Sequence, residues 1–494
     1  MRDTYGDHTI TKSSEDMKDR NLQHQQTFQN GNKSKADIIN IANQSSCKQI
    51  QNILQEMSIC GLFNRMKPQS EEHKFWNTQP VIQNDEKVEK FGPIELEPNS
   101  FRREPYKLPN GYIWHSCNLS NVDTKDFQDV YQLLADFYIE DDDNQFRFLY
   151  SKEFLHWALC VPGYYEDWHL GIKLEESNKL VAFISAIPNK VRIHNSKLLV
   201  VIVNYLCIHR KLRSKRLAPV LVKEITRRVR CRGIFQAIYT CGKDLTMPFA
   251  ACQYWHRSLN PKKLYEIGFS QLTRNMTISR AIKLYRVPSD HVLSGFRPAT
   301  IDDAPQILKL FEEYYYKYKD VSDDTYNNLI DYDTINHDIS LVTKAYDTIK
   351  DTSFGDKLII HPIFDLEMIK HIFINIPEVI TSYVRVNSEG NITDLFSFFC
   401  INSTVLNNPR HKLFKAAYGF YNIPNTCTIT ELYNEALIIA YKQKYDVFNV
   451  LDIHNNSEIL DSLKFVRGSG MLRYYIFNWQ VPLLSSENIY IYLF

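Results

Sequence analysis

Hydrophobic and polar positions recur along this chain in an order that occurs twice. Residues 124–138 begin with Thr-x-Asp and continue with apolar side chains at helical spacing, and residues 300–315 repeat that arrangement. Strand-like runs follow each copy, at 179–185 and 394–399, and further pairs lie at 233–239 with 445–451 and at 264–269 with 459–465. The pattern predicts two α+β halves, each with a sheet covered by helices in the order helix, strands, helix, strand, helix, strand. The alternative is chance similarity between amphipathic elements.

Changes of composition divide the chain further. Residues 1–45 are polar and almost free of aromatic side chains, which predicts a disordered tail. Pro288, Gly295 and Pro298 mark a join, so that the first half spans 46–290 and the second half spans 291–494. An Asp-rich stretch at about 316–357 has no counterpart in the first half, and we expect a surface insertion there, helical in part at 339–349.

The overall composition excludes several classes of protein. The 494 residues carry 58 Lys+Arg and 57 Asp+Glu, and a net charge of +1 argues against a nucleic-acid-binding protein with a global basic field. The ten cysteines form no CxxC pair, which is typical of a reduced intracellular protein. The chain shows no leader, and its longest apolar run, 198–208, is too short to span a bilayer. We therefore expect a soluble, cytoplasmic protein.

An apolar strand runs directly into a basic turn at 209–216, and the amphipathic pattern of a helix follows at 220–229. Free backbone N–H groups, the helix dipole and Lys/Arg side chains converge at such a point, so this segment predicts an anion site that suits a coenzyme pyrophosphate. The turn lacks the glycine pattern of ATP- and NAD-binding loops. The alternative is a solvated basic turn or a nuclear-import-like cluster.

Asn204 interrupts the apolar strand, and a buried Asn needs hydrogen-bond partners. It marks either a ligand contact or a strand irregularity. A bulge there would aim the amides of Tyr205 and Leu206 away from the sheet, as an oxyanion hole requires. The alternative is an ordinary hydrogen-bonded edge residue.

An acidic run at 140–143 precedes three alternating aromatic residues, Phe146, Phe148 and Tyr150. This combination suits a cationic peptide ligand through charge complementarity, although an acidic loop that caps the next element would give the same pattern. The sequence contains no nucleophile elbow and no metal-ligand spacing, which favours an enzyme that works by positioning and polarisation, without a metal.

The last seven residues, 488–494, are apolar and strand-like and end on Phe494. We expect this run to carry its carboxylate into the interior, where the group would need a cationic or donor partner or would become a stronger base. A final sheet strand whose carboxylate reaches solvent is the alternative.

Six runs of the sequence together resemble the eukaryotic glycylpeptide N-tetradecanoyltransferases, or N-myristoyltransferases. They are Lys-Phe-Trp-Asn-Thr-Gln-Pro-Val at 74–81 and the segments 140–148, 180–188, 204–219, 254–261 and 415–422. The resemblance covers the chain from about residue 50 onward, except the insertion. It implies two fused acetyltransferase-like (acyl-CoA N-acyltransferase) halves with pseudo-twofold symmetry around a saddle-shaped mixed sheet.

The resemblance also implies the reaction: transfer of myristate from myristoyl-CoA to the N-terminal glycine amine of proteins or nascent chains, without a tightly bound cofactor. The amides of Tyr205 and Leu206 would polarise the thioester carbonyl. The carboxylate of Phe494 would act as base, and Asn204 and Thr240 would hydrogen-bond the amine. The coenzyme contacts carried over are Lys74, Phe75, Trp76, Tyr205, Leu206, Cys207, Ile208, Ser214, Arg216, Leu217 and Ala218.

The peptide groove carried over from the resemblance comprises Tyr138, Asp141, Asp143, Phe146, Phe148, Tyr254, His256, Ser403 and Tyr418. The sequence departs from the family at Ser469, where an Asp is usual, at Thr246 and at residues 250–251. We expect a monomeric enzyme. The rival interpretations are an inactive paralogue that binds acyl-CoA or peptide as a scaffold, and an acetyl-CoA N-acetyltransferase.

Overall fold

The computed structural model of the chain describes residues 74–84, 86–95, 101–138, 146–242, 245–272, 276–318, 330–331, 358–406 and 408–493. The predicted tail, the acidic run at 140–143, nearly all of the predicted insertion and Phe494 lie outside these residues. Among the described residues, no helix is both long enough and apolar enough to cross a membrane.

The first half holds β1 (Tyr112–Ser116), α3 (Lys125–Phe137), β2 (Phe146–Leu149), α4 (Lys152–Leu159), β3 (His169–Leu174), β4 (Leu180–Ile193), β5 (Ser196–Ile208), α5 (Leu217–Arg230), β6 (Ala237–Cys241), β7 (Ala250–Ser258), α6 (Pro261–Glu266) and α7 (Ile278–Leu284). Short 3₁₀ turns are η2 (Trp76–Thr78), η3 (Glu166–Trp168) and η4 (Arg210–Lys215).

The second half holds β8 (Phe296–Pro298), α8 (Ala304–Lys317), β9 (Ile330–Asp331), β10 (Ile360–Pro362), α10 (Leu366–Phe373), β11 (Ile380–Val386), β12 (Ile392–Val405), β13 (Leu413–Gly419), α11 (Ile429–Lys442), β14 (Val447–Leu451) and β15 (Val466–Phe477). Its 3₁₀ turns are η5 (Ile301–Asp303), η7 (His454–Ile459) and η8 (Ser486–Asn488).

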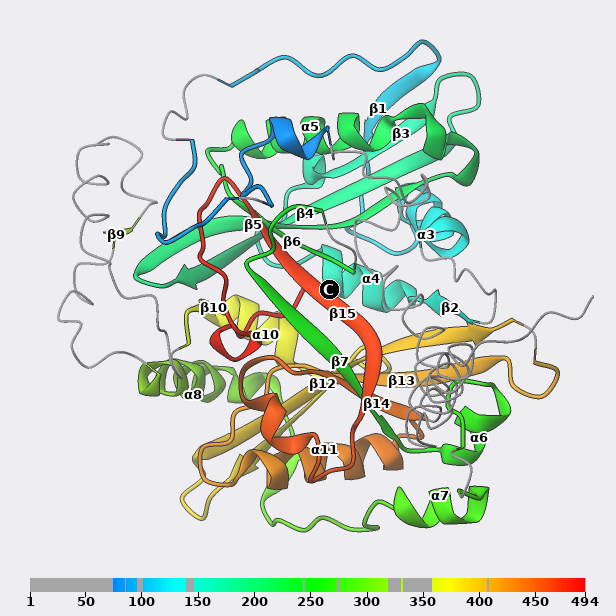
Figure 1. Ribbon diagram of the computed structural model, residues 1–494, viewed down its shortest axis with the longest axis vertical. Coiled ribbons are helices and arrows are strands. Elements are labelled where there is room, and N and C mark those ends of the chain that lie inside the picture. Colours follow the sequence, from blue (N-terminus) through cyan, green and yellow to red (C-terminus); the bar gives the residue numbers. More distant parts are fainter. Residues whose placement is uncertain are drawn as a thin grey trace, which may run out of the picture. The chain divides into compact units, whose positions relative to one another are not determined.

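The described strands form one mixed sheet whose order is symmetric about its centre: β1-β3-β4-β5-β6-β15-β7-β14-β13-β12-β11-β8 (Figure 1). Read from either end, the order pairs β1 with β8, β3 with β11, β4 with β12, β5 with β13 and β6 with β14. The two parallel pairs, β5–β6 and β13–β14, occupy equivalent places. The predicted duplication is therefore present in the topology and is not a chance similarity of elements.

The two halves exchange strands. β15 of the second half lies beside β6, and β7 of the first half lies beside β14. In the same way β2 pairs with β12, and β10 pairs with β4. Each half thus completes its sheet with strands from the other, so the two halves fold as one unit.

The predicted order of the last elements was wrong in the first half. The segment at 264–269 belongs to α6 and its C-terminal turn, which follow β7, whereas the segment at 459–465 lies between β14 and β15. The prediction missed this because β7 carries Gln253, His256 and Arg257, whose polar side chains hide a buried strand.

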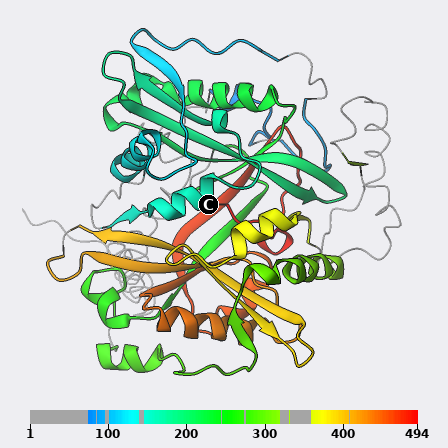
Figure 2. The same ribbon diagram turned by 180° about the vertical axis from the view of Figure 1, so that it is seen from behind.

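Helices cover both faces of the sheet, as the alternation of side chains along β5 shows. Tyr205 and Cys207 pack with α3 and α4, whereas Leu206 and Ile208 pack with α5. In the second half, α11 covers the face that corresponds to the one under α5, and α8 and α10 pack on the opposite face. From behind, α3 and α4 in cyan and α10 in yellow can be followed over the sheet (Figure 2).

The C-terminal segment, residues 489–493, is buried up to Tyr492, but it is not the regular strand that the sequence predicts. It makes one bridge, between Ile489 and Ile360, and the Tyr490 amide donates to the Ile360 carbonyl at 2.8 Å. Tyrosine hydroxyls and buried amides hold it instead of a ladder. Its apolar pattern is therefore that of a buried strand, although it lacks the hydrogen bonds of one.

The side chains of Tyr490 and Tyr492 are anchored in a chain of hydrogen bonds. The Tyr490 hydroxyl accepts from the Asn422 amide at 2.6 Å and donates to the Asn422 carbonyl at 2.7 Å. Asn456 donates to the Tyr492 hydroxyl at 3.2 Å, and Tyr433 joins Asn456 to Asn422. These hydrogen bonds join the segment to residues of η7, α11 and the turn after β13 and so fix its register.

His454 packs its ring on Tyr490, with centroids 4.7 Å apart, and its Nε2 lies 2.9 Å from the Tyr314 hydroxyl. Burial lowers its pKa to about 4, although a bond to the Glu487 backbone opposes the shift. The neighbouring groups that can titrate are His361, whose pKa burial lowers to about 3, Tyr314 and Tyr490.

We expect Leu221→Ala to lower the free energy of unfolding by about 2–5 kcal/mol, because Leu221 is fully buried between α5 and the sheet and its removal leaves a cavity. The urea midpoint measures the change. Leu483→Ala, at a side chain that is 63% exposed, is the control and should change stability by less than about 0.5 kcal/mol. Equal losses in the two variants would contradict the packing described for α5.

We expect stability to fall as the pH drops from 6.5 towards 4, because the unfolded chain protonates His454 in this range while the folded chain keeps it neutral. His454→Gln should flatten the dependence of the urea midpoint on pH, and His156→Gln, at a partly exposed position, should not. Identical slopes for the wild type and His454→Gln would rule out this source of acid sensitivity.

Candidate active site

β5 contains a bulge at the position where the sequence suggests one. Ser185 pairs with Asn204 and Phe183 pairs with Cys207, so Tyr205 and Leu206 together oppose Ile184. Tyr205 adopts a left-handed backbone with φ of +57°, which is unfavourable for a residue with a side chain. The equivalent pair of the second half, β12–β13, shows no such shift. The duplicated fold therefore carries this feature only in the first half.

The bulge turns a backbone donor out of the sheet. The Tyr205 amide donates to the hydroxyl of Tyr138, the residue that follows α3. Burial raises the pKa of Tyr138, so this hydroxyl stays protonated and neutral. The amide thus has a neutral hydrogen-bond partner.

Asn204 and Thr240 lie near each other beyond the end of the β5–β6 ladder. The parallel pair comprises only Val201 with Ala237 and Ile202 with Ile238, and both polar residues lie two positions further on, on the same face as Ile202 and Ile238. Both are buried. Two buried polar side chains thus lie at the point where the two strands stop pairing.

The segment in which the sequence predicts an anion site consists of a basic turn followed by the start of a helix. η4 contains the basic turn, and Arg216, with φ of +56°, leads into α5. α5 starts without a side-chain cap and without an acidic residue in its first turn. Ser214 and Arg216 are exposed beside the uncapped amides, whereas Arg213 donates to the Phe137 carbonyl and is structural. Cationic side chains and free helical N–H groups thus converge at one exposed point.

The segment 74–78 lies along the same side of the sheet. Trp76 stacks on Tyr239 of β6, with centroids 5.4 Å apart, and Tyr239 stacks on Tyr475 of β15 at the same distance. Lys223 of α5 lies over the ring of Phe75, 5.9 Å from its centroid, and Lys74 is exposed. Of the coenzyme residues implied by the resemblance, Cys207, Ile208, Leu217 and Ala218 are buried in β5 or at the start of α5.

An aromatic wall joins the bulge to the second half. The ring of Tyr205 contacts Tyr138 and Tyr150, with centroids 5.4 and 5.9 Å apart. The contacts continue through Phe154 and Phe399 to Tyr418 of β13, which meets Tyr254 of β7 edge to face. Residues of both halves therefore lie in one cluster.

The remaining predicted groove residues lie at the other end of this wall. β2 pairs with β12 so that Phe148 opposes Ser403, and Phe146 contacts Phe269. The ring of His256 on β7 meets that of Phe269 edge to face, with centroids 5.8 Å apart, and its Nδ1 lies 2.6 Å from Oδ1 of Asn449. Burial lowers the pKa of His256 and keeps the ring neutral. Asp141, Asp143 and Phe494 lie outside the described residues.

The sequence reasoning missed Asn449 and Phe269 as members of this cluster. Asn449 is a buried polar residue in the apolar strand β14 and hydrogen-bonds both His256 and Tyr418. It presents the same signal as Asn204, a single amide inside an apolar run, so it could have been found. Phe269 gave no signal, because a lone Phe after a short helix is an ordinary core residue.

Ser469 lies in a second irregularity, where the register of β15 shifts between Arg467 and Met471. Gln253 donates to the carbonyls of Gly468 and Gly470, at 3.1 and 2.6 Å, and holds this loop. A Cβ at Gly468 would lie 2.3 Å from His256 Nε2, so the close approach requires glycine there.

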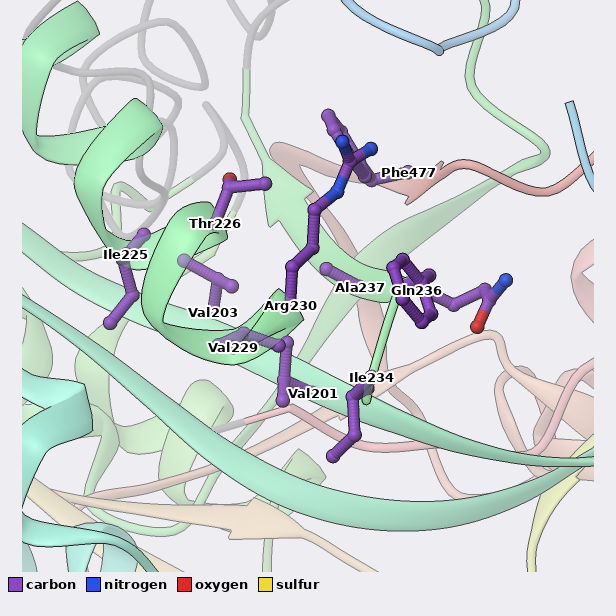
Figure 3. A pocket seen from close by; sticks show the side chains of 11 residues that line it. Val201, Val203, Ile225, Thr226, Val229, Arg230, Ile234, Gln236, Ala237 and Phe477 are labelled. Carbon is purple, nitrogen blue, oxygen red and sulfur yellow. The ribbon is translucent and has the colours of Figure 1, made fainter. Parts of the chain in front are cut away.

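Two hollows lie elsewhere. One of about 20 Å³, between α5, β5, β6 and Phe477, is ringed mainly by aliphatic side chains (Figure 3). It is an order of magnitude smaller than pockets that hold small molecules and marks imperfect packing under α5. The other, of about 430 Å³, is lined by Ile82, Asn84, residues 86–89, Met247 and residues 481–483, and contains none of the predicted site residues.

The comparisons with known proteins agree over both halves. The family model for the N-terminal domain of myristoyl-CoA:protein N-myristoyltransferase matches residues 93–252, and that for the C-terminal domain matches residues 266–353 and 337–489. The chain is 41% identical to glycylpeptide N-tetradecanoyltransferase 2 of Bos taurus over 89% of this chain and 80% of that protein. It is 42% identical to glycylpeptide N-tetradecanoyltransferase of Drosophila melanogaster, over 84% of this chain and 79% of that protein.

Among solved structures, the chain is similar to Saccharomyces cerevisiae N-myristoyltransferase with bound myristoyl-CoA. The TM-score is 0.74 at 34% identity, over 86% of this chain and all of that one. Both halves, their order and the sheet that joins them are thus shared, and the chain belongs to the myristoyl-CoA:protein N-myristoyltransferase family.

Proposed function

We propose that this protein transfers the myristoyl group of myristoyl-CoA to the α-amine of an N-terminal glycine. The observation that carries the proposal is the bulge in β5, which turns a backbone amide out of the sheet beside two buried polar residues, in a chain that matches both domains of the family. The relatives' names supply the substrate class. Without a backbone amide turned out of the sheet, the strand would offer no donor to polarise a thioester.

The coenzyme would lie along the first half. Its pyrophosphate suits the uncapped start of α5, where Ser214, Arg216 and the amides of Leu217 and Ala218 meet. Lys74, Phe75 and Trp76 would cover the coenzyme from the other side, and the strand residues Tyr205, Leu206, Cys207 and Ile208 would line the path to the thioester. The reaction needs no metal, and among the described residues no His/Cys/Asp/Glu group is arranged to hold one.

The thioester carbonyl oxygen would accept from the amides of Tyr205 and Leu206. In doing so it would take the place of the Tyr138 hydroxyl on the Tyr205 amide. The left-handed conformation of Tyr205 holds that donor before substrate arrives, which is what electrostatic preorganisation requires.

The glycine amine, with an ordinary pKa of about 7.7–8.0, must lose a proton before it can attack. We assign the proton to the carboxylate of Phe494, which follows the anchored segment 489–493, and we assign to Asn204 and Thr240 the hydrogen bonds that orient the amine. The nitrogen lone pair forms the new C–N bond, the tetrahedral intermediate collapses, and the C–S bond breaks. CoA leaves as a thiolate, and the second proton that the nitrogen loses as the amide forms protonates this thiolate.

The peptide would lie along the aromatic wall, in contact with Tyr138, Phe146, Phe148, Tyr254, His256, Ser403 and Tyr418. The acidic residues Asp141 and Asp143 would attract a downstream cation. A substrate hydroxyl or amide suits the neutral His256–Asn449 pair and Ser403 better than a charged group would.

We expect the full chain to release CoA from myristoyl-CoA with a peptide that begins Gly-Asn-x-x-Ser and not with its Ala-first twin, because a Cβ would clash where the amine is held. Thiol release, measured with a chromogenic disulfide, reports turnover. Acetyl-CoA is the control donor and tests whether the enzyme is an ordinary acetyltransferase. Tight myristoyl-CoA binding without release from either peptide would contradict the transferase and favour a scaffold.

Adding one glycine after Phe494 should lower kcat by about 10²–10⁴-fold, the usual contribution of a general base, and leave the affinity for myristoyl-CoA unchanged. The defect should shrink as the pH rises through about 8, since the amine then deprotonates without a base. The matched control adds one glycine at the other end of the chain. Unchanged turnover would remove the carboxylate from the mechanism while leaving the transfer itself intact.

A further inference from the structure

Exposed large apolar side chains gather around α6 and α7. Tyr265 on α6 is 46% exposed, and Ile282 and Leu284 on α7 are 48% and 38% exposed. Leu413, 42% exposed, begins β13. The loop before it is fastened to α6 by His411, whose Nε2 lies 2.7 Å from a carboxylate oxygen of Glu266. These elements lie together at the lower right of Figure 1. We call this surface the α6–α7 face.

Cationic side chains surround the same apolar residues. Lys262 is exposed on α6, and Arg280, Lys283 and Arg286 are exposed on α7 or just after it. Arg410 and Lys412 are exposed on the loop before β13. The total charge of the chain is only +1, so this density of cations is local.

The acidic groups of the α6–α7 face do not cancel its excess of positive charge. A hydrogen bond from His411, together with the charges of Lys262 and Arg410, lowers the pKa of Glu266, which is therefore already paired. Asp290 accepts a hydrogen bond from the Ser289 hydroxyl, and Asp461 is exposed. Among the described residues of this face, the six cations therefore outnumber the three carboxylates Glu266, Asp290 and Asp461.

We propose that the α6–α7 face docks the enzyme on an anionic lipid membrane. Near such a surface each Lys or Arg adds electrostatic attraction to the anionic headgroups, and exposed Ile, Leu and Tyr side chains insert at the level of the headgroups. A nucleic acid would use the cations but would leave Ile282, Leu284 and Leu413 without a role. The presence of both kinds of side chain on one surface therefore favours a membrane.

The α6–α7 face adjoins the peptide side of the site. Phe269, just after α6, contacts both His256 and Phe146. A docked enzyme would hold the emerging part of its substrate beside the bilayer into which a newly added acyl chain partitions. This docking goes beyond the proposed function and does not depend on it, since binding can be measured without turnover.

The test is co-sedimentation of the full chain with vesicles of phosphatidylcholine, alone or mixed with phosphatidylserine. The wild type should bind the mixed vesicles and release them at high salt. Two variants should each weaken binding about tenfold or more: Lys283→Glu with Arg286→Glu, and Ile282→Ser with Leu284→Ser. The matched control, Ile301→Ser with Lys309→Glu, changes an exposed apolar residue and a cation at η5 and α8 and should bind like the wild type.

Absence of wild-type binding to mixed vesicles would overturn the proposal. Loss of binding in the charge variant with full binding in the apolar variant would also overturn it, because that pattern describes a purely electrostatic surface such as a nucleic-acid site. Turnover of a short peptide in solution should be unchanged in all variants, since none of these residues contacts the site, and urea midpoints establish that each variant is folded.

Discussion

One extra residue in β5 determines the geometry on which the site depends. Without the bulge, both sides of the strand would stay in the ladder, and Tyr205 would use its amide as every other strand residue does. Because Tyr205 and Leu206 share the place of one residue, that amide leaves the sheet and reaches Tyr138. The bulge requires Tyr205 to adopt a left-handed backbone conformation, which is strained for a residue with a side chain. Ring contacts with Tyr138 and Tyr150 stabilise that conformation.

The position of the bulge also explains why the fold has one such site although it is duplicated. β5 leaves β6 after two residue pairs, and the polar residues Asn204 and Thr240 follow the end of that ladder. The equivalent strand β13 keeps a continuous register with β12 and presents Tyr418 as part of the wall. The first half thus carries the bulge, and the aromatic wall that extends from it includes residues of both halves.

Much of this could be predicted from local patterns. Thr124 predicted the start of α3 and accepts from the Phe127 amide, the basic turn predicted the uncapped helix α5, and Asn204 predicted the irregular strand. The residue roles came from the family resemblance. What could not be predicted was non-local: which strands the halves exchange, how the tyrosines at 490 and 492 are anchored, and that Phe269 meets His256. These contacts join residues far apart in the sequence, and no periodicity records them.

The exchange of strands has a consequence for how the protein is made. β7 ends at Ser258, yet β15, which separates it from β6 in the sheet, begins only at Val466. At about 5–20 residues per second, roughly 10–40 seconds of synthesis pass before that gap can be filled. During this time the edges of β6 and β7 have no partner, and the half that carries the bulge remains incomplete on the ribosome. Translation speed and chaperone protection of these edges therefore bear directly on the yield of active enzyme.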